Sequence, residues 1–389
     1  MSPMTRNDAD RPDIAIFLPS LEGGGAERVM AILANGFVSR GYRVDLVLAT
    51  ASGPYLAWVD ARVRVVDLGS GSILRSAVPL ARYLRTHHPR ALLAALSHAN
   101  VVALIAHRLV GSTARIVVSE RLSLAAARRH HRSFRDRAIR ALMRPSYRRA
   151  DRVVVVAEAM IAELESRLGL PRERLECIYN PVVDDALAAA AAQPCDHPWM
   201  SETAHTPVVL GCGRLSAQKD FATLVEAFRI VRSHRSARLI ILGEGEDRAA
   251  LEAQVRAGGI AGDVDLPGFV ENPFAYMSRA SVFVLSSRYE GMPGALIQAM
   301  ACGTRVVSTD CPTGPDEILE DGRWGELVPM GDARAMAEAV ERVLGTPSRD
   351  PRERAMAFAE PEAVTRYLAA LGFAAQASPI GQQDAARAR

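Results

Sequence analysis

The sequence predicts an α/β protein whose strands form parallel sheets in two domains. Two observations lead to this prediction. Short apolar runs, each long enough for one buried strand, alternate with segments of helical periodicity along most of the chain. The 389 residues suffice for two domains of ordinary size, and the apolar content of 49% is too high for a disordered chain.

Composition limits the location and the partners. The net charge of +3 is too small to indicate a nucleic-acid-binding protein. Five cysteines, an odd number without paired metal-ligand spacing, indicate a reduced, cytosolic protein. The polar start predicts no signal peptide. The most apolar twenty residues, 91–110, include Asn100, His107 and Arg108 and would make a poor membrane span.

The first predicted strand, Asp13–Leu18, is followed by the glycine run Gly23–Gly25 and a helix to about Ser39. Glycines between a strand and a helix let the backbone approach a phosphate or a sugar closely. The run fails as a dinucleotide fingerprint, because Arg28 stands where G-x-G-x-x-G needs its third glycine. A plain tight turn is the alternative interpretation.

Polar residues follow two of the next predicted strands, where a ligand could be met. They are Ser97–Asn100 and Ser119–Arg121. The predicted strands of this part of the chain are Arg43–Ala49, Val63–Leu68, Ala91–Leu96, Ile116–Ser119, Arg152–Val156 and Leu175–Tyr179.

Residues 128–152 form a basic stretch with ten arginines and two aspartates. Apolar residues from Phe134 to Tyr147 recur there at roughly helical spacing. A basic amphipathic stretch suits the surface of an anionic membrane. The alternative is a solvated helical face with ordinary arginines.

The second domain is predicted to open with the strand 207–211, after an Ala-rich, Pro-containing stretch that reads as a linker. Lys219 follows that strand closely and is the single lysine among 47 basic residues. Elsewhere the chain uses arginine for positive charge, so we expect a specific role for this lysine, the alternative being chance.

Val282–Leu285 reads as a buried parallel strand that ends at Ser286-Ser287. A short loop follows, and a helix begins at Pro293, where a proline costs no hydrogen bond. Gly303 ends that helix. In open α/β sheets such a loop lies at the edge where ligands bind.

This loop carries one carboxylate, Glu290, just before a helix whose free amides favour an anion. Gln298 lies about two turns into the helix. An acid beside a phosphate-binding helix terminus suits a nucleotide sugar. The alternative is a solvated loop acid and a surface glutamine.

The stretch resembles the signature of glycosyltransferase family 4, the retaining enzymes of GT-B architecture. Its pattern, E-G-x-P-x-x-L-x-E-A-M-A-C-G, is matched by Glu290, Gly291, Pro293, Leu296 and Ala299–Gly303. Other family motifs are resembled by Gly23–Arg28, Asn180–Asp184 and Gly213–Asp220. The chain departs at the second motif acid, which is Gln298. A glutamine carbonyl can accept the same ribose hydrogen bond, but it is neutral and weaker.

The resemblance implies a fold of GT-B type, with two Rossmann-like parallel-sheet domains facing an interdomain cleft. It implies a disordered start at 1–12, an acceptor-binding domain at 13–185 and a linker at 186–206. A nucleotide-sugar-binding domain would then span 207–350, with a helix at 351–373 crossing back to the first domain and a disordered tail at 374–389.

The resemblance also assigns roles. Glu290 would orient the donor sugar, Arg214 and Lys219 would neutralise the diphosphate, and His98 would reach the transferred sugar, unless it only caps or packs a helix. Asn100, Glu120 and Arg121 would line the acceptor side. The implied donor-binding residues are Gly24, Gly25, Gly213, Gly243, Gly245, Phe269, Val270, Gly291, Met292, Pro293, Gly294, Ala295, Leu296 and Gln298.

No metal and no cofactor are expected. The two Asp-x-Asp triplets, Asp8–Asp10 and Asp263–Asp265, do not sit at convincing strand-end loops. Protein cations and the helix terminus at Gly294 would therefore have to compensate the charge of the leaving diphosphate.

We therefore expect a retaining, metal-independent glycosyltransferase that moves a hexose-type sugar from a nucleotide diphosphate, a UDP-sugar in preference to a GDP-sugar, to an acceptor hydroxyl. The expected acceptor is a lipid-linked, cell-envelope or exopolysaccharide glycan. We expect the protein in the cytoplasm, at the inner face of the membrane, which residues 128–152 would contact. A GT-B epimerase or phosphorylase, or a silent sugar-nucleotide-binding protein, stays open as an alternative. The failed glycine fingerprint argues against a dehydrogenase.

Overall fold

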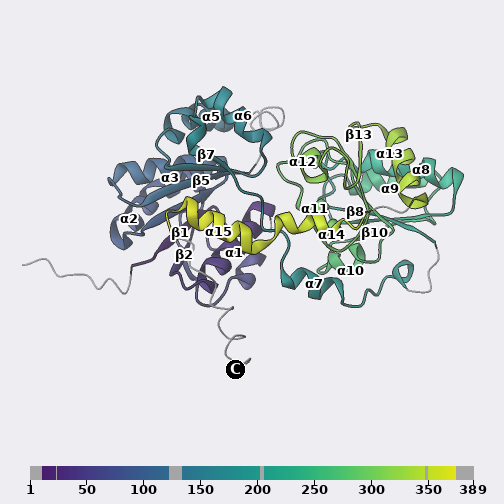
Figure 1. Ribbon diagram of the computed structural model, residues 1–389, viewed down its shortest axis with the longest axis horizontal. Coiled ribbons are helices and arrows are strands. Elements are labelled where there is room, and N and C mark those ends of the chain that lie inside the picture. The colour runs from purple at the N-terminus through teal and green to yellow at the C-terminus, as the bar shows by residue number, and fades with distance from the viewer. Residues whose placement is uncertain (1–10, 23, 122–133, 202–205, 347–348, 374–389) are drawn as a thin grey trace, which may run out of the picture. The chain divides into compact units, whose positions relative to one another are not determined.

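The computed structural model describes all residues except 1–10, 23, 122–133, 202–205, 347–348 and 374–389. The chain folds into two compact units, drawn in Figure 1. The first comprises the residues up to Pro181 together with the segment from Glu360, and the second runs from Val182 to Ala359.

The first unit is built on a seven-stranded sheet in the order β3-β2-β1-β4-β5-β6-β7, with every neighbouring pair parallel. All residues of its central strands β1 and β4 are buried, which is why the sequence shows continuous apolar runs there. Its strands are Ile14–Leu18 (β1), Val44–Leu48 (β2), Arg64–Asp67 (β3), Ala91–Ala95 (β4), Arg115–Glu120 (β5), Arg152–Val155 (β6) and Leu175–Cys177 (β7). Its helices are Gly25–Ser39 (α1), Ala77–His87 (α2), Ser97–Leu109 (α3), Phe134–Tyr147 (α5), Ala159–Leu168 (α6) and Glu360–Ala370 (α15).

The second unit is built on a six-stranded sheet in the order β10-β9-β8-β11-β12-β13, again parallel throughout. The prediction of parallel α/β sheets in two domains is therefore confirmed. Its strands are Val208–Cys212 (β8), Arg238–Leu242 (β9), Val264–Gly268 (β10), Val282–Leu285 (β11), Val306–Thr309 (β12) and Glu326–Val328 (β13). Its helices are Asp185–Ala191 (α7), Phe221–His234 (α8), Arg248–Ala257 (α9), Pro273–Met277 (α10), Gly294–Ala301 (α11), Pro315–Leu319 (α12), Ala333–Gly345 (α13) and Arg352–Ala355 (α14).

Helix α15 completes the core of the first unit although it comes last in the sequence. Its Val364, Tyr367 and Leu368 are buried in that core. The helix packs against α1, where Gly36 permits the approach, because a methyl group on Gly36 would lie 2.5 Å from a Val364 methyl. The Arg115 side chain of β5 donates a hydrogen bond to the Ala370 carbonyl at 2.8 Å.

The segment predicted as a linker, 186–206, contains regular structure. This segment contains most of α7 and the short 3₁₀ helix Pro198–Met200, and both belong to the second unit. Alanine is the strongest helix former, and the Asp184 side chain caps α7 by accepting a hydrogen bond from the Leu187 amide at 2.7 Å.

The single helix predicted at 351–373 is also interrupted. The chain forms α14, then a 3₁₀ turn at Met356–Phe358, then α15, and only α15 belongs to the first unit. Pro361 lies in the first turn of α15, where a proline favours the start of a new helix. The predictions of disorder at the two ends fall almost wholly on residues outside those that the structure describes.

Among the residues with a described structure, no helix is long and apolar enough to cross a bilayer.

Candidate active site

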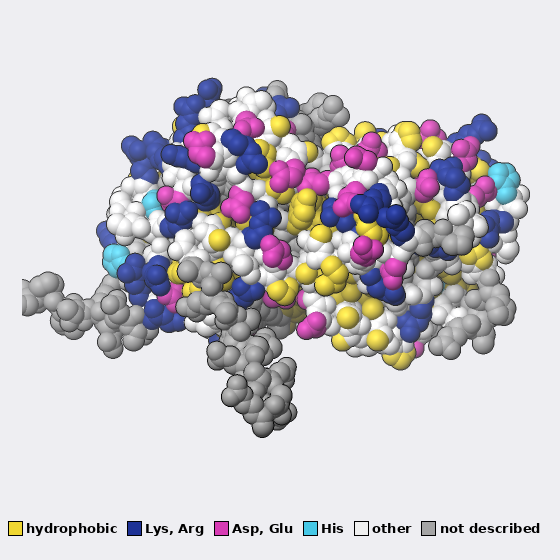
Figure 2. All heavy atoms as spheres, in the orientation of Figure 1, with side chains coloured by type: hydrophobic (Ala, Val, Ile, Leu, Met, Phe, Trp, Pro, Cys, Tyr) yellow, Lys and Arg dark blue, Asp and Glu magenta, His cyan; other side chains and the backbone are white. Residues whose placement is uncertain are grey.

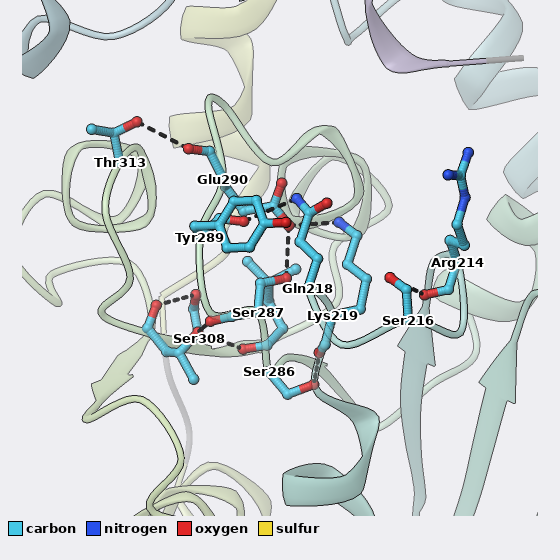
Figure 3. Close-up of polar contacts among 12 residues, drawn as sticks. Arg214, Ser216, Gln218, Lys219, Ser286, Ser287, Tyr289, Glu290, Ser308 and Thr313 are labelled. Atoms are coloured by element: carbon cyan, nitrogen blue, oxygen red, sulfur yellow. Dashed lines mark hydrogen bonds and ion pairs between the residues drawn. The ribbon is translucent and has the colours of Figure 1, made fainter. Parts of the chain in front are cut away.

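Two loops of the second unit meet at the carboxyl ends of the neighbouring strands β8 and β11. One follows β8 and runs from Gly213 to Asp220, and the other follows β11 and runs from Ser286 to Pro293. Figure 3 shows the polar side chains of both loops converging on one another. The structure thus brings together two segments that lie far apart in the sequence, as Lys219 and Glu290 do.

The centre of this region is an ion pair between Lys219 and Glu290. The Lys219 Nζ lies 2.5 Å from the Glu290 Oε1, and the two side chains are 19% and 10% exposed. The Ser287 hydroxyl donates a second hydrogen bond to the same oxygen at 2.6 Å. No residue that the structure describes donates a hydrogen bond to the Glu290 Oε2.

The backbones of the two loops are also linked. The Ser286 hydroxyl donates to the Lys219 carbonyl at 2.7 Å, and the Gln218 side chain donates to the Tyr289 carbonyl at 3.0 Å. The Arg288 amide donates to the Gln218 carbonyl at 2.8 Å. These bonds hold the backbones that carry both side chains of the ion pair in one rigid frame.

Arg214 does not join the ion pair. It is exposed, and in Figure 3 its guanidinium points away from Lys219 and Glu290. Its backbone carbonyl takes part in the local hydrogen bonding, by accepting from the Ser216 hydroxyl at 3.5 Å. The structure therefore places Lys219 beside an acid rather than beside the second expected cation.

The glycines of the loops after β8 and β9 are needed by the backbone itself. A methyl group on Gly243 would lie 2.0 Å from the Gly213 carbonyl oxygen, and one on Gly245 would lie 2.2 Å from the Leu215 carbonyl oxygen. The Leu215 amide donates to the Glu244 carbonyl at 2.9 Å. Loop packing explains these glycines, and their contact with a donor stays a prediction.

The remaining residues predicted to bind the nucleotide-sugar donor differ in their solvent exposure. Phe269, which follows β10, is 78% exposed, and Val270 is half-buried. Gly294, Ala295 and Gln298 at the start of α11 are half-exposed. The buried members of the set are Gly291, Met292, Pro293 and Leu296.

In the first unit, the predicted phosphate-approaching turn holds an acid. Gly24 caps α1 and Gly25 begins it, but the Glu27 carboxylate fills the space beside Gly24, 2.2 Å from where a Cβ would stand. A carboxylate there opposes a phosphate, because both are anions.

Asn100 and Glu120, expected on the acceptor side, are fully buried instead. The Asn100 side chain donates to the Glu120 Oε1 at 3.0 Å, the Ser97 hydroxyl donates to its Oε2 at 2.9 Å, and the Tyr147 hydroxyl donates to its Oε1. Burial raises the pKa of Glu120, and these three hydrogen bonds only partly oppose the rise. His98 itself is half-buried on the first turn of α3, the helix that also carries Ser97 and Asn100.

Arg121 is a third member of this buried region. Its guanidinium donates to the Asn180 side chain at 2.7 Å and to the Tyr367 hydroxyl at 3.3 Å. Burial lowers the pKa of Arg121, and the neighbouring Tyr367 and Glu27 oppose the change. Arg121 thereby links the end of β5 to α15 and to the segment that follows β7.

Sequence reasoning missed Ser287, Tyr147 and Tyr367. Tyr147 and Tyr367 lie far along the chain from their hydrogen-bond partners, Glu120 and Arg121. In the sequence, Ser287 appears only as the polar end of a strand. No spacing rule connects Tyr147 with Glu120 across an interval of 27 residues.

The second Asp-x-Asp triplet has partners within the protein. Asp263 pairs with Arg232 at 2.8 Å, and Asp265 pairs with His197 at 2.8 Å. Both lie at the amino end of β10, away from the loops that follow the carboxyl ends of β8 and β11. The first triplet, Asp8–Asp10, lies outside the described residues. In the part of the chain that the structure describes, no group of three acidic, histidine or cysteine side chains could hold a metal ion.

Two family models match the chain. Residues 23–186 match Glycosyltransferase Family 4, and residues 206–346 match Glycosyl transferases group 1. The first match lies almost wholly in the first unit and the second lies within the second unit, and together they cover well over half of the chain.

Curated relatives include a protein of Campylobacter jejuni, N-acetylgalactosamine-N,N'-diacetylbacillosaminyl-diphospho-undecaprenol 4-alpha-N-acetylgalactosaminyltransferase. It is 26% identical over 340 residues, which are 85% of this chain and 90% of the relative. The lipopolysaccharide core biosynthesis glycosyltransferase LpsE of Rhizobium meliloti is 33% identical over 201 residues, 52% of this chain and 56% of the relative.

Solved structures share the fold. Anabaena Alr3699/HepE in complex with UDP superposes with a TM-score of 0.76 at 20% identity, over 92% of this chain and 99% of that one. The apo lipopolysaccharide outer core galactosyltransferase WaaB superposes with a TM-score of 0.73 at 19% identity, over 92% and 99% of the two chains.

Proposed function

The chain belongs to glycosyltransferase family 4 and has the GT-B fold, and from that premise we propose that it is a retaining enzyme that uses a nucleotide-diphosphate hexose without a metal ion. Its activity is glycosyl transfer. The donor, the stereochemistry and the acceptor are the proposed parts.

The observation that carries the proposal is the pair of Lys219 and Glu290 beside the start of α11. Lys219 is the single lysine of the chain, and its ammonium keeps donors to spare beyond its bond to Glu290. The amides that begin α11 favour an anion at the same edge of the sheet. A diphosphate can meet both, with Glu290 oriented toward the attached sugar.

In the proposed reaction the bond between the anomeric carbon and the diphosphate oxygen breaks, and a bond from that carbon to the acceptor oxygen forms on the same face of the ring. The acceptor proton passes to the leaving phosphate oxygen. Lys219 stabilises the charge that develops on the diphosphate, and Arg214 turns toward it when the donor binds. His98, in the first unit, serves the transferred sugar and the acceptor.

The names of the relatives support the choice of substrates. The Anabaena protein with the same fold was crystallised with UDP and with UDP-glucose, which favours a UDP-sugar. The Campylobacter jejuni relative acts on a sugar linked to diphospho-undecaprenol, and amylovoran biosynthesis glycosyltransferase AmsD of Erwinia amylovora is 24% identical over 77% of this chain. A lipid-linked or exopolysaccharide acceptor at the cytoplasmic membrane face fits both.

Contact with an anionic membrane is part of this proposal, through the described part of the basic stretch. Arg144, Arg148 and Arg149 on and after α5 are exposed, and Figure 2 shows basic side chains over the visible part of the first unit where α5 and α6 lie. Residues 128–133 lie outside the described residues.

Substituting Lys219 tests the function. We expect Lys219→Ala to lower the release of UDP from a UDP-sugar by about 100- to 1,000-fold, because the developing phosphate charge loses a preorganised cation. The wild type is first screened by thermal shift against UDP, GDP, UDP-glucose and other sugar nucleotides, and turnover is measured with EDTA present.

Arg288→Ala is the matched control, because it removes a cation from the same loops that pairs with Asp220 and not with Glu290. A Lys219→Ala, Glu290→Gln double variant removes the unpaired buried acid should the single variant unfold. Full turnover by folded Lys219→Ala would overturn the proposal, and strict dependence on magnesium or manganese would overturn its metal-free part.

A silent sugar-nucleotide-binding protein is the second candidate, favoured by Gln298 at the position of the second motif acid. Wild-type binding of UDP without turnover of any donor, with lipid-linked acceptors present, would favour it.

A further inference from the structure

We propose that Ser287 is a positioning residue that holds the Glu290 carboxylate and directs its Oε2 toward the donor sugar. This inference rests on the proposed role of Glu290. Ser287 is fully buried two residues after the end of β11, and its hydroxyl donates to the Glu290 Oε1 at 2.6 Å.

The two oxygens of Glu290 are used differently. Oε1 receives hydrogen bonds from both Lys219 and Ser287, which occupies its two lone pairs. Oε2 receives none from the residues that the structure describes. The carboxylate is therefore anchored through one oxygen and presents the other, a strong acceptor, for a hydroxyl group of a ligand.

Lys219 cannot hold this orientation alone. Its ammonium is a point charge on a flexible stem, and the terminal torsion of a glutamate has a broad, two-fold preference. When a diphosphate attracts the ammonium, the lysine is shared between two anions. Ser287 is neutral, so it keeps its bond to Glu290 without competing for the phosphates.

Ser287 is itself held in place. Its carbonyl accepts a hydrogen bond from the Thr309 hydroxyl of β12 at 2.6 Å. The preceding Ser286 donates instead to the Lys219 carbonyl at 2.7 Å. Successive side chains of an extended segment point to opposite sides, so the adjacent serines fix the two partners of the ion pair separately.

The test compares Ser287→Ala with Ser286→Ala, which removes the same hydroxyl group from the neighbouring position. With UDP-glucose as the probe, or with whichever UDP-sugar the wild type turns over, we expect Ser287→Ala to lower kcat by about 10- to 100-fold, because small misplacements of a reacting group have effects of that size. The Kd for UDP should stay within about 2-fold of the wild-type value, because UDP lacks the sugar that Oε2 would bind.

Two further variants separate positioning from a merely structural role. Ser287→Thr keeps a hydroxyl and should recover most of kcat. Ser287→Ala added to Glu290→Gln should lower kcat no further than Glu290→Gln alone, because the two changes remove one interaction. Ser286→Ala, which acts through the Lys219 backbone, should weaken UDP binding, whereas Ser287→Ala should not.

The outcomes distinguish this inference from the proposed function. Wild-type kcat in Ser287→Ala, while Glu290→Gln is inactive, would overturn the inference alone. Equal losses of UDP affinity, kcat and thermal stability in Ser287→Ala, without recovery in Ser287→Thr, would also overturn it. A fully active Glu290→Gln, or a wild type that turns over no UDP-sugar, would remove the proposed function first and this inference with it.

Discussion

At the scale of one residue, Glu120 shows how a carboxyl group is accommodated in the interior of the protein. Its three hydrogen-bond donors come from α3 and α5, and none of them is a cation. Burial without an opposite charge favours the protonated form, so its pKa lies above the ordinary value. The Asn100 Oδ1 is also buried, and none of the described residues donates a hydrogen bond to it.

This raised pKa predicts a pH dependence of stability. The folded state keeps a proton on Glu120 at pH values where the unfolded chain has lost it, so unfolding releases that proton. The contribution of Glu120 to the free energy of unfolding should therefore be largest below the unfolded pKa of about 4.3, and should fall as the pH rises from there through the folded pKa. One such group contributes a slope of up to about 1.4 kcal/mol per pH unit.

Glu120→Gln should remove this contribution, as measured by urea unfolding at a series of pH values from acid to neutral. Glu173→Gln, an exposed acid of the same unit, is the control and should leave the slope as in the wild type. The same pH slope in wild type and Glu120→Gln would refute the assignment.

At the scale of the element, α5 illustrates how packing changes the meaning of an amphipathic pattern. Its apolar residues Ile139, Met143 and Tyr147 are buried and the helix packs against α3, so that face is used within the unit. Among the described side chains of α5, Leu142, which is 45% exposed, is the one large apolar residue left on the solvent side. Any membrane contact of this part of the helix must then be mainly electrostatic.

We expect the triple variant Arg144→Glu, Arg148→Glu, Arg149→Glu to lower binding to phosphatidylserine-containing vesicles by at least about 100-fold, since each basic residue near such a surface contributes about 1 kcal/mol. Vesicle flotation measures the binding of the wild type and the variant, and the binding of the wild type should weaken with added salt. The control is a triple charge reversal of exposed arginines in the second unit, Arg235, Arg256 and Arg334. Wild-type protein that stays unbound on anionic vesicles would exclude the membrane proposal.

At the scale of the whole molecule, the order of the sequence and the division into units do not coincide. The first unit is completed by α15, which follows the entire second unit in the chain. Tyr367 has no exposed surface, and its hydroxyl contacts both the Ser119 hydroxyl and the Arg121 guanidinium. The first unit therefore depends on a segment that a cut between the two family matches would remove.

Deleting residues 360–389 should destabilise the first unit and leave the second folded. The deletion removes three large buried side chains of α15, each contributing about 1.5–3 kcal/mol, against a total stability of about 5–15 kcal/mol for a domain. Calorimetry should show the loss of one unfolding transition. The other transition should remain, and UDP should still raise its midpoint temperature.

The matched control deletes only residues 374–389, which leaves α15 intact, and should unfold as the full chain does. If both deletions keep the same transitions, α15 is not needed by the first unit.

The sequence by itself determined the two parallel α/β domains and the family, and it predicted roles for Lys219 and Glu290. These properties depend on local patterns, since apolar runs mark buried strands, and a motif keeps its spacing within one loop and helix. Tertiary structure alone decided that Lys219 pairs with Glu290 while Arg214 points away, and that Glu120 and Asn100 are interior. It also decided that α7 belongs to the second unit and that the Ser287 hydroxyl contacts a carboxylate. Each of these depends on which distant segments the fold brings within hydrogen-bonding distance, or on which face of an element is covered, and the spacing of residues along the chain does not contain that information.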